Sequence, residues 1–502
     1  MPEATLSPHL KSAIRNYAFL FFGSIFFHLA GTWNLPLIDR DEPRFAEASR
    51  EMIERSNYVV PYFNNQFRFD KPPLAYWAQA GSYRLFGEND FAARFPSALA
   101  AALTALSIFA WGSRIGGSNL GWWASIIFTL SLQTFLHAKA AVADMWLVLF
   151  VTLAHWAGYE LLRDLLGAQS QVSLVRPAVA SYQYRTPWWW VFYLSLAFAF
   201  LAKGPIGWVP LLTILSTRIF LSEPKLNQRF QFLFGSFLML AIVAFWGIPA
   251  LVRTHGQFFV VGIGRHVVGR SFVSMEGHGA NSFGMYLLLL PFYFVTIFIG
   301  FFPWSIKLPW LTKKLWHRRD KIDNYLTTGG AIIFIIFTLV KTKLPHYTLP
   351  AFPLIALLLA RRLTTESSAC FLRNCAIASV SVYLAIAFVV PPFAARFFPA
   401  YQLYQESRDY LRPDMEFGAV DFNEPSLVWY FRGRVREFLT PLNSSRMADF
   451  MAKPGPRLLI APRSLATTVF ANHPENWKIF STRGFNIAKG KRVELTLVLK
   501  LE

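Results

Sequence analysis

Residues 17–38 read YAFLFFGSIFFHLAGTWNLPLI, and the charged stretch DRDEPRFAE follows directly at 39–47. An apolar block of about 20 residues is long enough to cross a bilayer as a helix. Similar blocks recur along the chain, and we predict about eleven spans, within a range of ten to thirteen. The sequence therefore predicts an α-helical polytopic membrane protein. The predicted spans are 17–38, 92–112, 119–136, 140–162, 187–202, 205–222, 231–252, 281–304, 326–341, 345–361 and 370–396.

The formal net charge of +20 could indicate nucleic-acid binding, but its distribution favours a membrane topology. Lys and Arg concentrate in alternate short connectors, as in residues 307–321, which is typical of cytoplasmic loops. We therefore expect no nucleic-acid partner, a multi-pass protein of the inner membrane and a cytoplasmic N-terminus. The loops at 39–91 and 253–280 and the C-terminal segment are then expected on the extracytoplasmic side. The first apolar block is expected to be a span and not a cleaved signal peptide.

The composition changes near residue 397, where the long apolar blocks end. The runs FGAV at 417–420, RLLIA at 457–461 and VELTLVL at 493–499 are β-rich and bounded by Pro, Gly and Asn. We predict a transmembrane domain over 1–396 and a small extracytoplasmic α/β domain over 397–502. Cys370 and Cys375 indicate neither a disulfide framework nor a metal cluster.

The 39–91 loop is the first candidate for chemistry. Asp41 and Glu42 precede Pro43, which fits the first turn of a helix, and Arg40 and Arg44 flank the pair. Acidic residues at such a position are often only helix caps. Because this pair directly follows a span, and ionisable groups at a membrane edge are costly, we favour a functional role.

Further charged residues fall at the expected extracytoplasmic ends of the spans. Asp144 lies in the otherwise apolar block at 140–162, where a carboxylate without a function is unfavourable. Snorkelling to the headgroups explains any single lysine, but it does not explain why carboxylates and cations share one side. Such a set suits a phosphate-linked donor. The cations and the phenol are Lys71, Lys203, Arg270, Lys343 and Tyr347.

Several ordered motifs together resemble a known family. They are DEPRFAEASREM at 41–52, VVPYFN at 59–64, FRFDKPP at 67–73, AKGP at 202–205 and TKLPHYTLP at 342–350. The sequence resembles the 4-amino-4-deoxy-L-arabinose lipid A transferases and, more distantly, the protein O-mannosyltransferases. Both are GT-C enzymes that use polyprenyl-phosphate sugars. The resemblance covers most of residues 17–361.

The resemblance implies a role for each matching residue. Asp41, with Glu42 beside it, and Asp144 match the essential acidic positions, while Arg44, Lys71, Lys203 and Tyr347 match positions that hold the carrier phosphate. Arg270 and Lys343 are the candidate substrate-loop cations. The family's FEKP reads FDKP here, so Asp70 takes the place of a Glu. The resemblance implies a structural zinc ion as a possible metal, with Asp70, His266 and His278 as candidate ligands.

We therefore expect an inverting glycosyltransferase that moves a sugar from undecaprenyl phosphate to a lipid A-like or other cell-envelope acceptor on the periplasmic side. Asp41 is expected to act as a base or to orient the acceptor. The alternative is a flippase of lipid-linked sugars, which shares the spans and the membrane-edge charges. Transporters commonly show internal repeats with broken helices, and the sequence contains no evident repeat. A purely structural membrane subunit would leave the ordered motifs unexplained.

Overall fold

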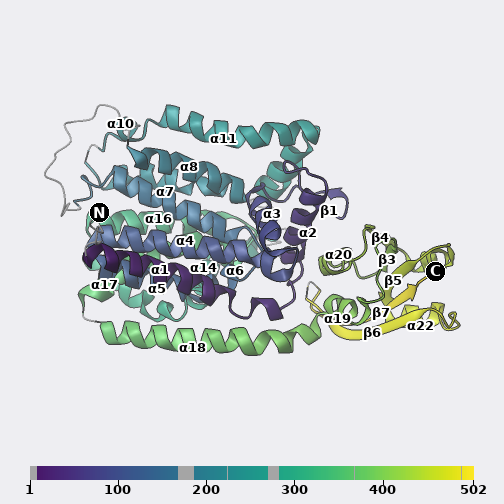
Figure 1. Ribbon diagram of the computed structural model, residues 1–502. Coiled ribbons are helices and arrows are strands. Elements are labelled where there is room, and N and C mark those ends of the chain that lie inside the picture. The colour runs from purple at the N-terminus through teal and green to yellow at the C-terminus, as the bar shows by residue number, and fades with distance from the viewer. Residues whose placement is uncertain (1–7, 168–185, 223, 270–281, 367, 488) are drawn as a thin grey trace, which may run out of the picture.

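The computed structural model describes residues 8–167, 186–222, 224–269, 282–366, 368–487 and 489–502. Long helices run side by side in a bundle, and a smaller α/β unit lies at one end of it (Figure 1). The α-helices of the bundle are α1 (Pro8–Leu29), α4 (Asp90–Gly116), α5 (Ser118–Thr129), α6 (Leu132–Ala138), α7 (Asp144–Leu161), α8 (Pro187–Lys203), α9 (Val209–Ser216), α10 (Leu226–Phe230), α11 (Phe232–Arg253), α13 (Phe283–Leu288), α14 (Phe292–Gly300), α15 (Leu308–His317), α16 (Lys321–Leu339), α17 (Phe352–Thr365) and α18 (Ala369–Ala394). Shorter helical turns are η1 (Thr32–Asn34), η3 (Pro205–Trp208), η4 (Thr217–Ile219), the π-helical η5 (Phe258–Gly269), η6 (Trp304–Lys307), η7 (Pro345–Ala351) and η8 (Ala395–Phe397).

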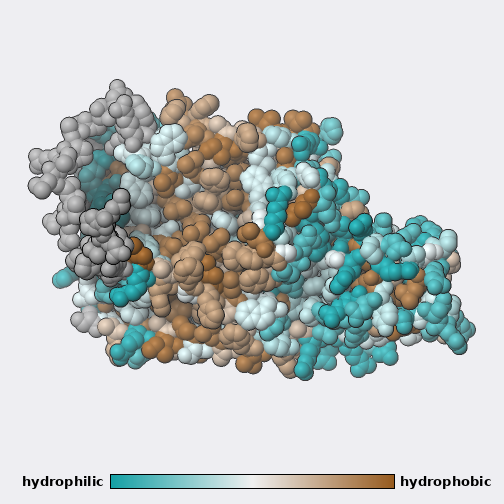
Figure 2. Space-filling model, in the orientation of Figure 1, coloured by the Kyte–Doolittle hydropathy of each residue, from teal (hydrophilic) through white to brown (hydrophobic). Residues whose placement is uncertain are grey.

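The helical membrane fold is confirmed, whereas the number of spans stays a prediction. Within the described residues, α4, α11, α16 and the segment Ala369–Phe397 are each long and apolar enough to cross a membrane. Figure 2 shows apolar side chains across the visible face of the bundle and a mostly polar surface on the α/β unit. Every predicted apolar block coincides with helix, but several blocks are interrupted. Pro291 separates α13 from α14, and Pro345 begins a 3-10 turn before α17, because proline cannot donate the helical hydrogen bond.

The first helix ends at Leu29, earlier than the predicted residue 38. Gly31 has a φ of 74°, and a Cβ there would lie 1.8 Å from the Ala387 carbonyl oxygen, so only glycine fits this turn. The Lys139 ammonium donates to the carbonyls of residues 27, 28 and 30, which satisfies the end of the helix. A long apolar run alone could not reveal this ending.

Ion pairs gather several of the basic connectors at one end of the bundle. The end of α4 meets the end of α7 through Arg114 and Glu160, and Arg229 before α11 pairs with Asp164. Arg361 at the end of α17 pairs with Asp320 before α16, at 2.8 Å. Connectors that were predicted to share the cytoplasmic side therefore share one end of the molecule.

The 39–91 loop is an ordered layer at the opposite end of the bundle. It contains α2 (Asp41–Glu54), the hairpin of β1 (Tyr62–Phe63) and β2 (Gln66–Phe67), and α3 (Leu74–Phe86). Phe45, Ala48 and Met52 lie at helical spacing on α2 and are buried against Tyr76 of α3 and Ala143. This packing fixes the segment that begins at Asp41.

The α/β unit follows η8. Its elements are α19 (Pro399–Ser407), β3 (Glu416–Val420), α20 (Pro425–Arg432), β4 (Leu439–Leu442), η9 (Ser444–Arg446), α21 (Met447–Ala452), β5 (Arg457–Pro462), α22 (Arg463–Val469), β6 (Lys478–Asn486) and β7 (Lys491–Lys500). The strand order is β4-β3-β5-β7-β6, with β4, β3 and β5 parallel and β5, β7 and β6 antiparallel. The predicted β-rich runs lie in β3, β5 and β7. Strands β4 and β6 were not predicted; they lie at the edges of the sheet, where β4 accommodates Pro441.

Helix α20 joins the α/β unit to the loop layer through buried charges. Arg432 contacts Glu47 and lies 2.8 Å from Glu54, both on α2. Arg50 donates to the Trp429 carbonyl at 2.9 Å, and its guanidinium lies 3.9 Å from the centre of the Trp429 ring. The loop layer and α20 therefore form one continuous packed structure.

We expect the stability of this contact to depend on pH through Asp39. Burial raises the pKa of Asp39 to about 7, although hydrogen bonds from the Ser426 amide and hydroxyl oppose the shift. A carboxyl whose pKa is raised in the folded state stabilises the folded protein most at pH values below the pKa of the unfolded state. This contribution is lost as the pH rises through the folded-state pKa of about 7. Asp39→Asn keeps both hydrogen-bond positions but does not titrate. The thermal midpoint of the wild type should therefore fall relative to that of Asp39→Asn between pH 5 and pH 8. Parallel profiles would contradict this assignment.

Candidate functional site

A cavity of about 910 Å³ lies between the bundle and the loop layer. Its walls are mostly apolar and come from α8, η3, α9, α11, α16 and η7. Leu212, Leu240 and Ile248 line the cavity and also have 46%, 49% and 60% of their surface exposed. Because these exposed apolar residues belong to α9 and α11, the cavity opens through an apolar side of the bundle. It suits a ligand with a long apolar chain.

One end of this cavity is charged. Asp144 at the start of α7 and Lys203 at the end of α8 form an ion pair of 2.5 Å, because the turns that follow α6 and α8 meet there. The Lys203 ammonium lies 5.5 Å from the centre of the Tyr347 ring. Lys71 lines the same cavity. The structure thus brings together four of the residues that the sequence analysis selected.

A second group of polar residues connects the cavity to Asp41. Asp70 lines the cavity and pairs with Arg68 at 3.0 Å, and Arg68 donates to the Tyr76 hydroxyl at 3.0 Å. Burial lowers the pKa of Arg68, but Tyr76, Asp70 and Asp41 raise it, and the net shift is upward. Asp41 is exposed, and its side chain forms no hydrogen bond or ion pair with any described residue. Its carboxylate is therefore not committed to a structural contact.

Glu42 has a different environment. It is buried and accepts hydrogen bonds from Arg94 on both oxygens, at 2.9 and 2.8 Å. The Ile38 and Ala141 amides donate to the same carboxylate, each at 2.7 Å. Glu42 thus ties the start of α2 to the turn that carries Asp144. It does not line the cavity within the described part of the chain, and its catalytic role stays a prediction.

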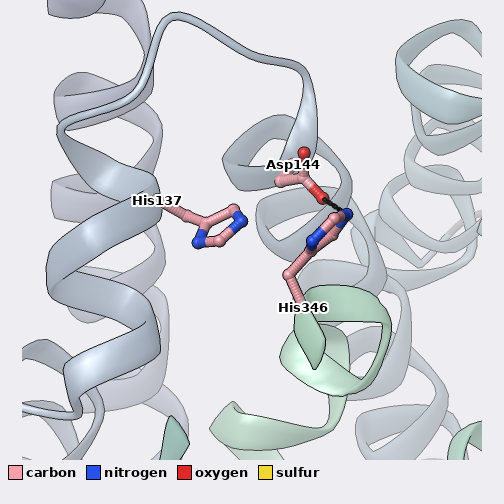
Figure 3. A group of neighbouring side chains, drawn as sticks. All are labelled: His137, Asp144 and His346. Atoms are coloured by element: carbon pink, nitrogen blue, oxygen red, sulfur yellow. Dashed lines mark ion pairs between the residues drawn. The ribbon is translucent and has the colours of Figure 1, made fainter. Parts of the chain in front are cut away.

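Two histidines that the site prediction did not include lie beside Asp144: His346 lines the cavity, and His137 stands next to His346. Figure 3 shows His137 and His346 around the Asp144 carboxylate. The ring centres of the two histidines are 4.9 Å apart, and His346 Nε2 lies 3.8 Å from Asp144 Oδ1. His137 stands seven residues before Asp144, and His346 directly precedes Tyr347. Their closeness to the selected motifs was the available signal, but sequence spacing alone does not show that the three segments meet.

The remaining predicted residues lie elsewhere or outside the described part. Arg44 does not line the cavity among the described residues, and its charge acts on Asp39. Lys343 donates to the carbonyls of Phe337 and Thr338 in the last turns of α16, at 3.0 and 2.5 Å. The substrate roles of Arg44 and Lys343 stay predictions.

The predicted zinc site is not tested by the structure. Arg270 and His278 lie outside the described residues, and only the backbone of His266, within η5, is described. Asp70, the third predicted zinc ligand, pairs with Arg68.

Comparison with known proteins relates this arrangement to a family. Residues 70–248 match the family model described as dolichyl-phosphate-mannose-protein mannosyltransferase. An undecaprenyl phosphate-alpha-4-amino-4-deoxy-L-arabinose arabinosyl transferase of Aeromonas hydrophila is 30% identical over 68% of this chain and 58% of its own length. An uncharacterized protein of Aquifex aeolicus is 24% identical over 65% of this chain and 60% of its own length. The chain thus spans less than two thirds of each of these relatives.

The fold comparison extends over nearly the whole chain. The crystal structure of ArnT from Cupriavidus metallidurans bound to undecaprenyl phosphate matches with a TM-score of 0.71 and 18% identity. That match covers 96% of this chain and 98% of the other. The bundle, the ordered loop layer and the α/β unit are therefore one shared architecture. The chain therefore shares the fold of ArnT.

Proposed function

We propose that the protein is a glycosyltransferase that takes a sugar from a polyprenyl-phosphate carrier. The observation that carries the proposal is the cavity, whose apolar walls open between α9 and α11 and whose inner end holds Lys71, Lys203 and Tyr347. An isoprenoid chain fits the apolar part, and the phosphate fits the cationic end. Undecaprenyl phosphate, the ligand of the similar ArnT, has this chemistry.

The residues of the charged end support a single displacement with inversion. Lys71 and Lys203 stabilise the charge that grows on the leaving phosphate as the glycosidic bond breaks. Asp144 holds the Lys203 ammonium in place, at 2.5 Å. Asp41 takes the proton of the acceptor hydroxyl, or orients the acceptor, from the solvent side of the Arg68–Asp70 pair. Glu42 acts as a positioning residue, because it fixes both the Asp41 and the Asp144 segments.

We propose a lipid A-like or other cell-envelope acceptor on the periplasmic side. The exposed Asp41 and the polar loop layer support an acceptor that approaches from water. The basic connectors gathered at the other end of the bundle support a cytoplasmic location for that end. Helix α1 begins at the end opposite to the α/β unit, which supports a cytoplasmic N-terminus and an extracytoplasmic C-terminal domain (Figure 1).

Binding of the carrier lipid tests whether the cavity and its cationic end hold a polyprenyl phosphate. Purified protein in detergent is titrated with undecaprenyl phosphate, and bound lipid is quantified by native mass spectrometry. Lys71→Met and Lys203→Met should each weaken binding about 10- to 100-fold, since each removes a charge-assisted contact worth about 1.5–3 kcal/mol. Lys313→Met, at an exposed position away from the cavity, is the matched control. Equal binding by all four proteins would remove the basis of the proposal.

The apolar arm of the cavity makes a separate prediction at Gly247. This residue of α11 lines the cavity, and a Cβ at its position meets nothing within 4 Å. Gly247→Phe should fill the space of the isoprenoid chain and weaken undecaprenyl phosphate about 10-fold or more. Gly247→Ala, which leaves the space open, should bind as the wild type does.

A short-chain probe separates filling of the arm from general damage. Farnesyl phosphate carries the same phosphate on a much shorter isoprenoid chain. The loss caused by Gly247→Phe should therefore be smaller for farnesyl phosphate than for undecaprenyl phosphate. An equal loss for both lipids would show that the substitution perturbs the charged end, and the chain would have to lie elsewhere.

A further inference from the structure

Three potential metal ligands converge at the charged end of the cavity from three separate segments. His137 belongs to α6, Asp144 begins α7, and His346 lies in η7 (Figure 3). One ligand atom from each residue lies within 4.8 Å of the others. We propose that these residues bind a divalent transition-metal ion. They are distinct from the residues of the predicted zinc site.

The hydrogen bonding of His137 supports this role. His137 Nδ1 lies 3.2 Å from the Gln133 backbone carbonyl oxygen, which accepts a hydrogen bond from a protonated Nδ1, and 3.2 Å from Gln133 Nε2. With Nδ1 protonated, Nε2 keeps a lone pair for a metal. A ligating histidine usually donates its second ring nitrogen to a carbonyl or carboxylate in this way, which fixes the tautomer and the ring orientation. The backbone of α6 thus prepares His137 as a ligand.

The ligand types indicate which ions fit. Two imidazoles and one carboxylate favour Zn²⁺ and related transition ions over Mg²⁺ or Ca²⁺, which prefer oxygen ligands. Ligand atoms around a tetrahedral zinc ion lie roughly 3.3 Å apart, given bonds of about 2.0–2.1 Å. His346 Nε2 and Asp144 Oδ1 are 3.8 Å apart, so a small rotation of the ring brings them to this distance. A three-residue set leaves a coordination position open.

Lys203 competes with the ion for Asp144. Its ammonium lies 2.5 Å from Asp144 Oδ1, the oxygen that also faces His346. Metal binding therefore turns Lys203 away from Asp144 and toward the cavity that both residues line. In that position the ion and the Lys203 ammonium both face the carrier phosphate in the cavity. Only this use of the ion, to hold the carrier phosphate, rests on the proposed function; the metal site itself does not.

Metal content of the purified full-length protein tests the site. The protein in detergent is stripped with a chelator, dialysed against ZnCl₂ or MnCl₂, and analysed by elemental mass spectrometry. The wild type should retain one more ion per chain than the double variant described next, and X-ray absorption should show two imidazole ligands for that ion. The double variant His137→Ala/His346→Ala should bind this ion about 100-fold more weakly or not at all. This loss should be at least as large as the loss caused by removing a residue that hydrogen-bonds to a metal ligand. His473→Ala, an exposed histidine of the α/β unit, is the control.

Lys203→Met is a sharper test. Because Lys203 and the ion compete for Asp144, this variant should bind the metal as tightly as the wild type or more tightly. A metal content of the double variant equal to that of the wild type, or no retained ion in the wild type, would overturn the site. Metal binding without sugar transfer would leave the site intact and reject the proposed function. Sugar transfer by a protein that binds no metal would reject the metal site and support the proposed function.

Discussion

Arg432→Ala should lower the free energy of unfolding of the α/β unit with its loop layer by about 3–5 kcal/mol, the usual effect of breaking a buried ion pair. Arg432 has 3% of its side chain exposed, and Glu47 and Glu51 have none. The substitution leaves these carboxylates close together in a buried site. Burial already raises the pKa of Glu47 to about 7, although Arg50 and Arg432 lower it.

Two further variants make this prediction specific. Arg483→Ala breaks an exposed pair with Glu494 in the same unit, where the side chains are 76% and 45% exposed, and should cost at most about 1 kcal/mol. Adding Glu47→Gln to Arg432→Ala should recover part of the loss, since it removes one buried charge. Chemical unfolding in detergent, followed by limited proteolysis of the α/β unit, measures all three. Equal effects of Arg432→Ala and Arg483→Ala would show that the buried network does not hold the unit.

Asp41→Asn should reduce sugar transfer by about 10²- to 10⁴-fold, the range of a general base, while carrier binding and folding stay unchanged. Asp41 is exposed, and its side chain makes no hydrogen bond to any described residue, so the substitution removes no structural contact. Its electrostatic partners Arg68 and Tyr76 remain in place. The expected result is a loss in kcat at similar apparent affinity for the donor.

The control is Asp409→Asn, at another exposed carboxylate, with only a distant ion pair of 3.8 Å to Arg408. Its transfer rate should equal that of the wild type. A decrease common to both variants would point to a general effect of charge. Full activity of Asp41→Asn would remove the base role and leave the residue as the first residue of α2.

The sequence predicted the helical part of the structure well because apolar length is a direct signal. The sequence also placed Lys71, Asp144, Lys203 and Tyr347 on the same expected side, and these four residues line one cavity. The end of α1 was not predictable, because it depends on the close approach of Gly31 to Ala387, far along the chain.

The contacts of Asp41 and Glu42 were also not predictable from the sequence. Asp41 and Glu42 are neighbours of the same charge, and the sequence gives no reason to separate them. The structure does so through Arg94, which binds Glu42 from 52 residues away and leaves Asp41 exposed. Likewise, His137 and His346 reach Asp144 only because three separate segments of the chain meet.

Sugar transfer itself is the measurement that separates a glycosyltransferase from a flippase. Wild-type protein, Asp41→Asn and Lys203→Met are incubated with radiolabelled undecaprenyl-phosphate sugars and extracted envelope acceptors, and the label is followed into acceptor and carrier. We predict that the wild type transfers label to an acceptor. Asp41→Asn should transfer less label although it still binds the donor, and Lys203→Met should transfer less label because it binds the donor more weakly. Movement of intact labelled carrier between leaflets by the wild type, with no label in any acceptor, would contradict the transferase and indicate a flippase.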